Sequence, residues 1–311
     1  MKPIWLLAIG AGLASAVMFL AMMLGTVMAF PLAYLAPLPL FMVGLSMGVT
    51  ASAVASVVSS VAVAMALGGS LLTGLVYLIV NGVPAAILSR QALLGREAEQ
   101  GGIEWYPAGH LVGCLTVLGL IALPGTVILL SGLSGGLDQV MAGFSEASMQ
   151  RMLPPEQLAG MRTFLQRIGT VVPGIIVISW MVMIAANGAL AQGLLKRIGR
   201  NQRPGPDIAG IELPEWILVA AAAAALFGYF LPDPLGFFGK NALAILLLPF
   251  VVLGLAVIHT VARHFKAGIF MLAIVYILLI LFSPLVVTIA LLGVLDQLLG
   301  LRRRIAAPPS T

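Results

Sequence analysis

The stretch YLAPLPLFMVGLSMG, from Tyr34 to Gly48, contains two prolines, two glycines and no charged residue. It is apolar enough for the interior of a bilayer, but Pro37 and Pro39 interrupt any helix that runs through it, because proline lacks a backbone N–H and crowds the preceding turn. In hydrocarbon, the backbone groups freed by such a break need partners, so the segment is predicted to face the inside of a helical bundle. Its free carbonyl groups could line a cavity, because discontinuous helices often mark binding sites in transporters.

The composition of the whole chain agrees with a membrane location. Hydrophobic residues make up 61% of the sequence and charged residues 9%, which is too little polar surface to cover a soluble globule. Runs such as ILVAAAAAALFGYFL and IFMLAIVYILLILF do not alternate between polar and apolar residues, so they indicate helices and not the strands of a barrel. We therefore predict an all-α, polytopic transmembrane helical bundle of about 8–10 membrane segments, with one membrane domain over residues 1–311.

The candidate spans lie between a few charged clusters, and each is close to the length that a helix needs to cross a bilayer. The first run has one lysine before it and could be read as a signal peptide cleaved after Ala29, but its apolar part is long and further spans follow, so we expect an uncleaved helix. The predicted spans are Ile4 to Phe30, Leu32 to Gly48 (short and proline-broken), Val49 to Leu67, Ser70 to Ser89, Ala108 to Ser131, Val171 to Leu195, Pro214 to Leu231, Asn241 to Ala262, and a long run from Ala267 to Leu299.

Basic clusters predict the orientation, because short loops rich in lysine and arginine stay in the cytoplasm. These clusters lie at Lys196 to Arg203, Arg263 to Lys266 and Arg302 to Arg304, so the N-terminus, the basic loop 196–213 and the tail 302–311 are expected to be cytoplasmic. For the last run, two interpretations are open. A break at Ser283 to Leu285 would make it a hairpin with both flanking clusters inside, whereas one tilted, kinked helix would leave a cluster outside.

The same topology places the loop 132–170 on the extracytoplasmic side of the membrane. Apolar residues recur there at helical spacing on both sides of a proline pair, which predicts two short amphipathic helices. They would form a structural cap on the bundle or a lid over a substrate cavity.

Catalysis inside a membrane normally requires ionisable groups at depth. The eleven acidic residues all lie in loops or at span ends, so we expect no catalytic residue, no metal, no cofactor and no nucleic-acid partner. Ser134, in a Gly-x-Ser-Gly pattern, and His259 could in principle form the dyad of an intramembrane serine hydrolase. The predicted topology separates them, and His259, like His110, is better explained as a helix-end residue bonded to a neighbouring carbonyl.

A few polar residues within the spans are the candidates for ligand binding. Tyr77 and Asn81 lie one turn apart, and Asn187 lies in a later span, so these residues with Pro37 and Pro39 could hold a small polar molecule between helices. The ordinary alternative is that the asparagines hydrogen-bond between helices. Ala8, Gly12 and Ala16 form a ridge of small residues, which would pack in its own bundle or dock a partner membrane protein.

Several segments in order resemble the YybS-like family of predicted bacterial membrane proteins, a domain of unknown function (2232). They are APLPLFMVGLSMG, WMVMIAANGALAQGLLKR, LPEWILVAAAAAALFGYF, NALAILLLPFVVLGLAVIH and LLGVLDQLLGLRRR. In the last of these, Asp296 is expected to form a structural ion pair with Arg302, Arg303 or a basic loop. The resemblance implies a helical membrane protein of the bacterial inner membrane and implies no reaction.

More remotely, the family is similar to the S components of energy-coupling-factor transporters. That similarity implies a small helical bundle that binds a vitamin and docks through small-residue ridges onto a coupling subunit. The leading hypothesis is therefore a small-ligand-binding or transport-associated membrane component without enzymatic activity. A non-catalytic scaffold subunit of a larger membrane assembly is the alternative, and an intramembrane enzyme is the third hypothesis.

Overall fold

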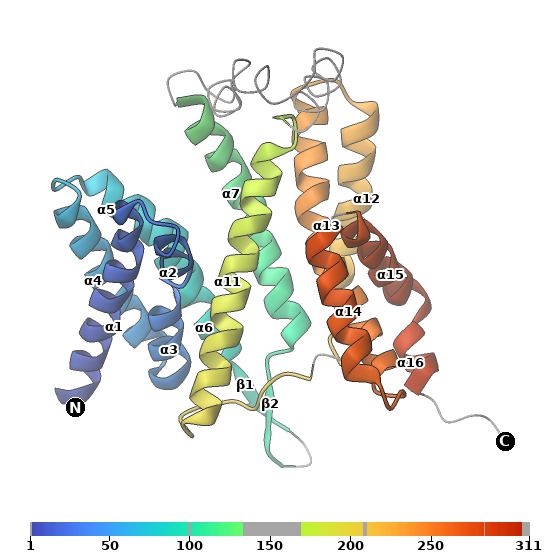
Figure 1. Ribbon diagram of the computed structural model, residues 1–311, viewed down its shortest axis with the longest axis horizontal. Helices are drawn as coiled ribbons and strands as arrows, with labels where there is room; N and C mark the ends of the chain where they lie inside the picture. The colour runs from blue at the N-terminus through green and yellow to red at the C-terminus, as the bar shows by residue number, and fades with distance from the viewer. Residues whose placement is uncertain (1, 99–100, 133–168, 208–209, 283, 307–311) are drawn as a thin grey trace. The chain divides into compact units, whose positions relative to one another are not determined.

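The computed structural model describes residues 2–98, 101–132, 169–207, 210–282 and 284–306, most of which are helical (Figure 1). Three of its apolar helices are shorter than 18 residues, namely Glu215–Phe230, Gly268–Leu279 and Leu285–Leu299. Seven helices within the described residues are long and apolar enough to cross a membrane: Trp5–Leu24, Ala29–Met47, Val49–Ala66, Leu71–Ala92, Ala108–Gly132, Val172–Arg197 and Leu235–Ala262. The predicted all-α, polytopic fold class is confirmed.

The chain divides into two compact units. Unit 1 comprises Met1–Leu115 and Trp180–Asp207, and unit 2 comprises Thr116–Ser179 and Ile208–Thr311. The boundaries fall inside two long helices, α7 (Ala108–Gly132) and α11 (Val172–Arg197), so each of them contributes to both units. The single membrane domain over the whole chain stays a prediction.

Unit 1 is built around α4, which packs against α1, α3, α5, η2 and α6. Small residues allow these close approaches, because a Cβ atom added at Gly12 would lie 2.5 Å from the carbonyl oxygen of Ala55, and one at Gly74 would lie 2.8 Å from that of Ser60. The elements of unit 1 before α7 are α1 (Lys2–Leu20), η1 (Ala21–Leu24), α2 (Ala29–Tyr34), α3 (Leu38–Met47), α4 (Val49–Ala66), α5 (Leu71–Tyr77), η2 (Leu78–Gly82), α6 (Val83–Ala92), β1 (Gly95–Glu97) and β2 (Ile103–Trp105).

The polar segment after α6 folds into the short antiparallel hairpin β1–β2. Gly101 and Gly102 adopt positive φ at its turn, which glycine tolerates without steric strain. Arg96 Nε donates to the carboxylate of Glu104 at 2.7 Å on the exposed face, and this hydrogen bond lowers the pKa of Glu104. The pair stabilises a hairpin that is too short to be recognised from periodicity.

Unit 2 contains the helices drawn from orange to red in Figure 1. Its α13 starts earlier than the predicted span at Asn241, because Lys240 is exposed and lies on the helix without interrupting it. A Cβ atom added at Gly254 of α13 or at Gly293 of α15 would overlap a backbone carbonyl of the other helix, so these two helices approach closely. The helices are α12 (Glu215–Phe230), α13 (Leu235–Ala262), α14 (Gly268–Leu281), α15 (Leu285–Leu299) and α16 (Leu301–Ala306).

The last apolar run forms a helical hairpin. Residues 231–234 join the antiparallel helices α12 and α13, so α12 runs along the first half of α13 and the segment before α12 lies beside the second half. Arg302 and Arg303 bond to Ile211 and Glu212 in that segment, and α16 packs on α13, so α15 returns to the end of the unit from which α14 started (Figure 1). The hairpin interpretation holds, and the interpretation as one kinked helix is wrong.

The two arms of this hairpin are short. With 14 and 15 residues, they are about 21 and 23 Å long at the rise of an α-helix, against roughly 30 Å of hydrocarbon. Neither arm is therefore long enough for a full perpendicular crossing of the hydrocarbon.

This topology can be tested with single cysteines at Lys266→Cys and Arg304→Cys in a Cys114→Ala background. We expect a membrane-impermeant maleimide to label both positions from the same side of sealed vesicles, because both lie at the open end of the hairpin. Leu235→Cys, at the opposite end of α13, is the control and should be labelled from the other side. Labelling of positions 266 and 304 from opposite sides would contradict the hairpin.

The contact between α13 and α15 predicts a second outcome. Gly293→Val should destabilise the protein by about 1–3 kcal/mol, because the added side chain must push α15 away from the carbonyl of Phe250. Gly125→Val in α7 is the control, since no atom lies within 4 Å of the Cβ position there. Unfolding in detergent, followed by circular dichroism, measures the difference, and equal effects of the two substitutions would argue against the close contact.

Candidate functional site

The proline break between α2 and α3 leaves carbonyl groups that the helix cannot satisfy. The N–H groups at the break bond three residues back, so the carbonyls of Tyr34 and Ala36 are open to partners from elsewhere. Asn187 of α11 donates from Nδ2 to the Tyr34 carbonyl at 2.9 Å, and Ser15 of α1 donates from Oγ to the Ala36 carbonyl at 2.5 Å. Side chains from two other helices thus replace the missing backbone donors.

A second irregular segment, η2, lies in the same unit, and side chains from other helices donate to its carbonyls as well. It is a π-helical turn between α5 and α6, and such turns change the carbonyl pattern of a helix and are frequent at functional sites. Trp180 of α11 donates from Nε1 to the carbonyl of Val80 at 2.8 Å. Ser56 of α4 makes a longer bond, 3.4 Å, to the carbonyl of Gly82.

Helix α11 is common to both irregular segments. Trp180 and Asn187 lie seven residues apart, which is about two helical turns, so they share one face. Asn187 is fully buried and uses its Nδ2 for Tyr34 and for Met183 of its own helix. Its Oδ1 has no hydrogen-bond partner among the described residues, which leaves one buried acceptor beside the proline break.

Tyr77 is packed in the core of unit 1, and its hydroxyl is already bonded. The Tyr77 hydroxyl lies 2.5 Å from Ser15 Oγ. Because the Ser15 proton goes to the Ala36 carbonyl, the tyrosine is the donor in this pair. The ring of Phe19 meets the Tyr77 ring edge-on at 5.0 Å, and Asn81 reaches only the backbone carbonyl of Tyr77, at 3.5 Å.

The predicted ligand-binding residues Pro37, Pro39, Tyr77, Asn81 and Asn187 all belong to unit 1. Pro37 is buried at the start of α3 and Pro39 lies in its first turn. The carbonyls expected to line a cavity are instead bonded to side chains, so the break is bridged by the protein itself. Whether these residues also bind a ligand stays a prediction.

The ridge of small residues on α1 packs inside its own unit. Ala8 and Ala16 are buried, and Gly12 lies against Ala55 and Val58 of α4. The ridge therefore serves helix packing in unit 1, and these three residues offer no exposed face to a second protein.

The histidines have the structural roles expected of them or lie at the surface. His259 Nδ1 lies 2.9 Å from the carbonyl of Leu255, one turn earlier on α13, as predicted for a helix-end residue. His110 is exposed and meets the ring of Tyr106. Ser134 and almost all of the predicted amphipathic loop 132–170 lie outside the described residues.

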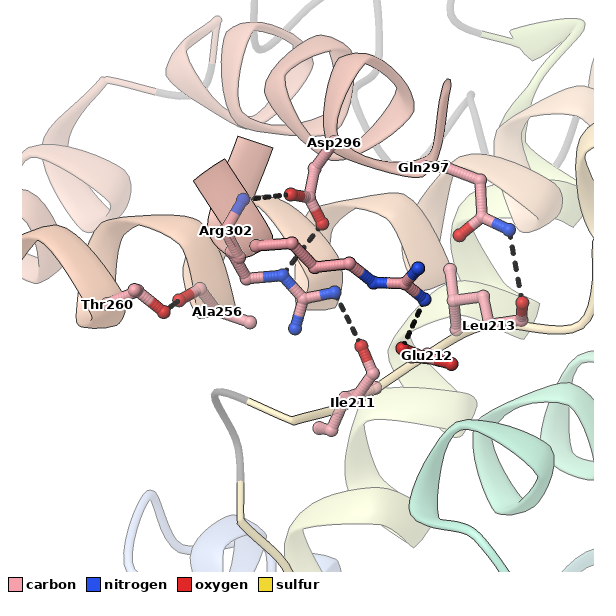
Figure 2. A network of polar contacts seen from close by, with 9 residues as sticks. Ile211, Glu212, Leu213, Ala256, Thr260, Asp296, Gln297 and Arg302 are labelled. Atoms are coloured by element: carbon pink, nitrogen blue, oxygen red, sulfur yellow. Dashed lines mark hydrogen bonds and ion pairs between the residues drawn. The ribbon is translucent and has the colours of Figure 1, made fainter. Parts of the chain in front are cut away.

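Asp296 forms the predicted structural ion pair, which Figure 2 shows at the end of α15. Its carboxylate accepts from Arg302 Nε at 2.7 Å and from the Arg302 backbone N–H at 2.9 Å. Gly300, with φ of 63°, lets the chain turn back so that both bonds form. Arg302 also donates to the Ile211 carbonyl at 2.6 Å, and Gln297 donates to that of Leu213 at 3.1 Å (Figure 2).

Sequence reasoning missed several side chains that form hydrogen bonds within unit 1 or within unit 2. Ser15 and Trp180 were not predicted to donate hydrogen bonds to other helices, although hydroxyl and indole groups in apolar spans are signals of hydrogen bonding. Asn241 in unit 2 is fully buried, accepts from the Gly174 N–H at 2.7 Å and donates to the Thr170 carbonyl at 2.9 Å. It was read as the first residue of a span, whereas it fixes the start of α11.

These features define a polytopic helical membrane protein whose irregular backbone is satisfied by polar side chains. The model of the family described as "Predicted membrane protein (DUF2232)" matches residues 13–297, so the chain belongs to that family, as the sequence motifs indicated. No curated protein and no solved structure shows a significant match.

The ion pair predicts a difference between two acidic residues. Asp296→Asn should cost about 3–5 kcal/mol of stability, because it leaves the poorly accessible guanidinium of Arg302 without its counter-ion. Glu212→Gln, which breaks the exposed pair with Arg303, should cost at most about 1 kcal/mol. Thermal unfolding in one detergent measures both, and similar losses would show that burial does not matter at Asp296.

Proposed function

We propose that this protein is a transport-associated membrane component that binds a small uncharged ligand where α11 meets the α2–α3 break and η2. The observation that carries the proposal is that one helix, α11, bonds to both irregular segments through Asn187 and Trp180. In membranes, irregular backbone is tolerated only where protein or water satisfies it, and transporters place their substrate sites at such positions.

The chemistry of the ligand follows from the groups beside the break. Asn187 Oδ1 is a buried acceptor without a partner among the described residues, so it is available to a ligand N–H or O–H group. The charged residues of α6 and α11, namely Arg90, Lys196 and Arg197, lie in the last turns of these helices. A ligand between the helices would therefore meet no counter-charge, which favours a neutral molecule.

The packing of α11 supports a route for such a ligand. A Cβ atom added at Gly188 would lie 3.6 Å from the ring of Phe41, an ordinary contact, whereas one at Gly82 would lie 2.7 Å from Ser56. Helix α11 is thus joined to α2 and η2 by the hydrogen bonds of Asn187 and Trp180, and it meets α3 at Gly188 without interlocked backbones. Breaking the Asn187 and Trp180 bonds would let it move aside and admit a ligand.

The proposal also covers the location and orientation of the protein and the partner that it would bind. The protein would lie in the inner membrane of a bacterium with its N-terminus and basic loops in the cytoplasm. The position of Arg263–Lys266 and Arg302–Arg304 on one side of unit 2 supports this orientation. We propose no enzymatic activity. If the resemblance to S components expected from the sequence is correct, a coupling subunit of a transporter would be the partner.

A scaffold subunit of a larger assembly is the second candidate. It is favoured by the Tyr77, Ser15 and Ala36 contacts, because a core whose polar groups already bond to one another needs no ligand. In this case, partner membrane proteins would contact exposed apolar faces of the helices.

Native mass spectrometry of the gently solubilised protein tests both candidates, because it reports bound small molecules and associated subunits together. We expect a small-molecule adduct whose affinity falls about tenfold in Asn187→Ala, since one hydrogen bond to a buried group is lost. Ser60→Ala is the control, because Ser60 bonds to the Gly74 carbonyl away from α11. A co-purifying subunit without a small molecule would favour the scaffold, and a bare monomer would contradict both.

A further inference from the structure

One end of unit 1 carries a compact polar cluster. Here α3 and α6 end, and the segment that follows α11 docks onto both of them. Gln202 donates to the Ser46 carbonyl of α3 at 2.6 Å, and Arg203 donates from Nη1 to the Ala92 carbonyl of α6 at 3.0 Å. The backbone carbonyl of Arg203 accepts from the side chains of Gln192 and Asn201, at 2.8 and 2.9 Å. These bonds hold the Arg203 side chain in place.

One buried donor in this cluster has no acceptor among the described residues. Arg203 is only 7% exposed, and its Nε has no hydrogen-bond partner. The unbonded hydroxyl of Ser89 is a different case, because it is packed against Gly44 of α3, where an added Cβ atom would lie 2.4 Å from Ser89 Oγ. Buried polar atoms are rarely left unbonded, and each such case requires an explanation.

The charge of this cluster is also unbalanced. The ion pairs found among the described residues do not include Arg203, and burial lowers the pKa of its guanidinium. Arg90, Lys196, Arg197 and Arg200, which are exposed, add positive charge at the adjacent helix ends. Arg203 could serve only to cap the end of α6, through the bond from Nη1 to the Ala92 carbonyl. That role does not explain why its Nε–H has no acceptor or why its charge has no counter-ion among the described residues.

We propose that Arg203 binds a phosphate-type anion at this end of unit 1. A guanidinium offers parallel N–H groups that match two oxygens of one phosphate. The anion would supply the missing acceptor and counter-charge together. The phosphate could belong to a phospholipid head group, which meets basic residues at helix ends, or to a soluble phosphate. This site is separate from the neutral-ligand site proposed above.

The test uses the full-length protein in detergent, with two probes. Isothermal titration with inorganic phosphate detects a soluble ligand, and native mass spectrometry with added phosphatidylglycerol, against phosphatidylcholine, detects a head group. We expect wild-type binding of at least one of the two anionic probes and a loss of about tenfold or more in Arg203→Gln. Arg200→Gln is the matched control in the same segment and should bind like the wild type.

One further variant and a second readout keep the test decisive. Arg203→Lys keeps the charge but removes the Nε–H, so it should fold and bind more weakly than the wild type. Arg203→Gln should weaken anion binding without changing the adduct that depends on Asn187, which separates this proposal from the neutral-ligand site. Absence of wild-type binding to either anionic probe, or equal losses in Arg203→Gln and Arg200→Gln, would overturn the proposal.

Discussion

The structure depends on one constraint: a peptide group in hydrocarbon must find its hydrogen-bond partner within the protein. Regular helices satisfy it locally, and most of this chain does so. The α2–α3 break and the π-helical turn η2 do not, and each requires a donor from another helix. Ser15, Asn187 and Trp180 provide these donors. The position of α11 in unit 1 is therefore fixed by the irregularities of other helices.

Some helices of unit 1 are held together by close packing, and others mainly by hydrogen bonds. Glycine and serine let α4 approach its neighbours until backbone and side-chain atoms interlock, as at Gly12 and Gly74. The contact of α11 with α3 at Gly188 is looser, and the side chains of Asn187 and Trp180 bridge from α11 to α2 and η2. Interlocked helices can separate only at a large cost in dispersion energy, whereas hydrogen bonds between helices in a membrane contribute about 1 kcal/mol or less each. The structure thus combines a rigid group of helices with one that is attached through a few polar bonds.

Much of this fold could be predicted from the sequence, because composition and proline positions act locally. The helical class, the broken second span and the Asp296–Arg302 pair all follow from short stretches of residues. The partners of the freed carbonyls could not be predicted, because Asn187 and Tyr34 are 153 positions apart and any buried polar residue might have served. The hairpin of α14 and α15 was undecided for the same reason: its direction depends on the contact of Arg302 with Ile211, which no local pattern encodes.

In unit 1, two buried polar atoms that have no hydrogen-bond partner among the described residues differ in chemistry. At the proline break, Asn187 and Ser15 donate to the free carbonyls of Tyr34 and Ala36. The Oδ1 atom of Asn187 is then a buried acceptor without a donor among the described residues. At the end of α6 the imbalance is reversed, because the Nε–H of the buried Arg203 guanidinium has no acceptor among the described residues. The unbonded acceptor at the break is the reason for proposing a neutral donor there, and the unbonded cationic donor is the reason for proposing an anion here. The two proposals rest on the same rule, because a buried polar group without a partner costs free energy.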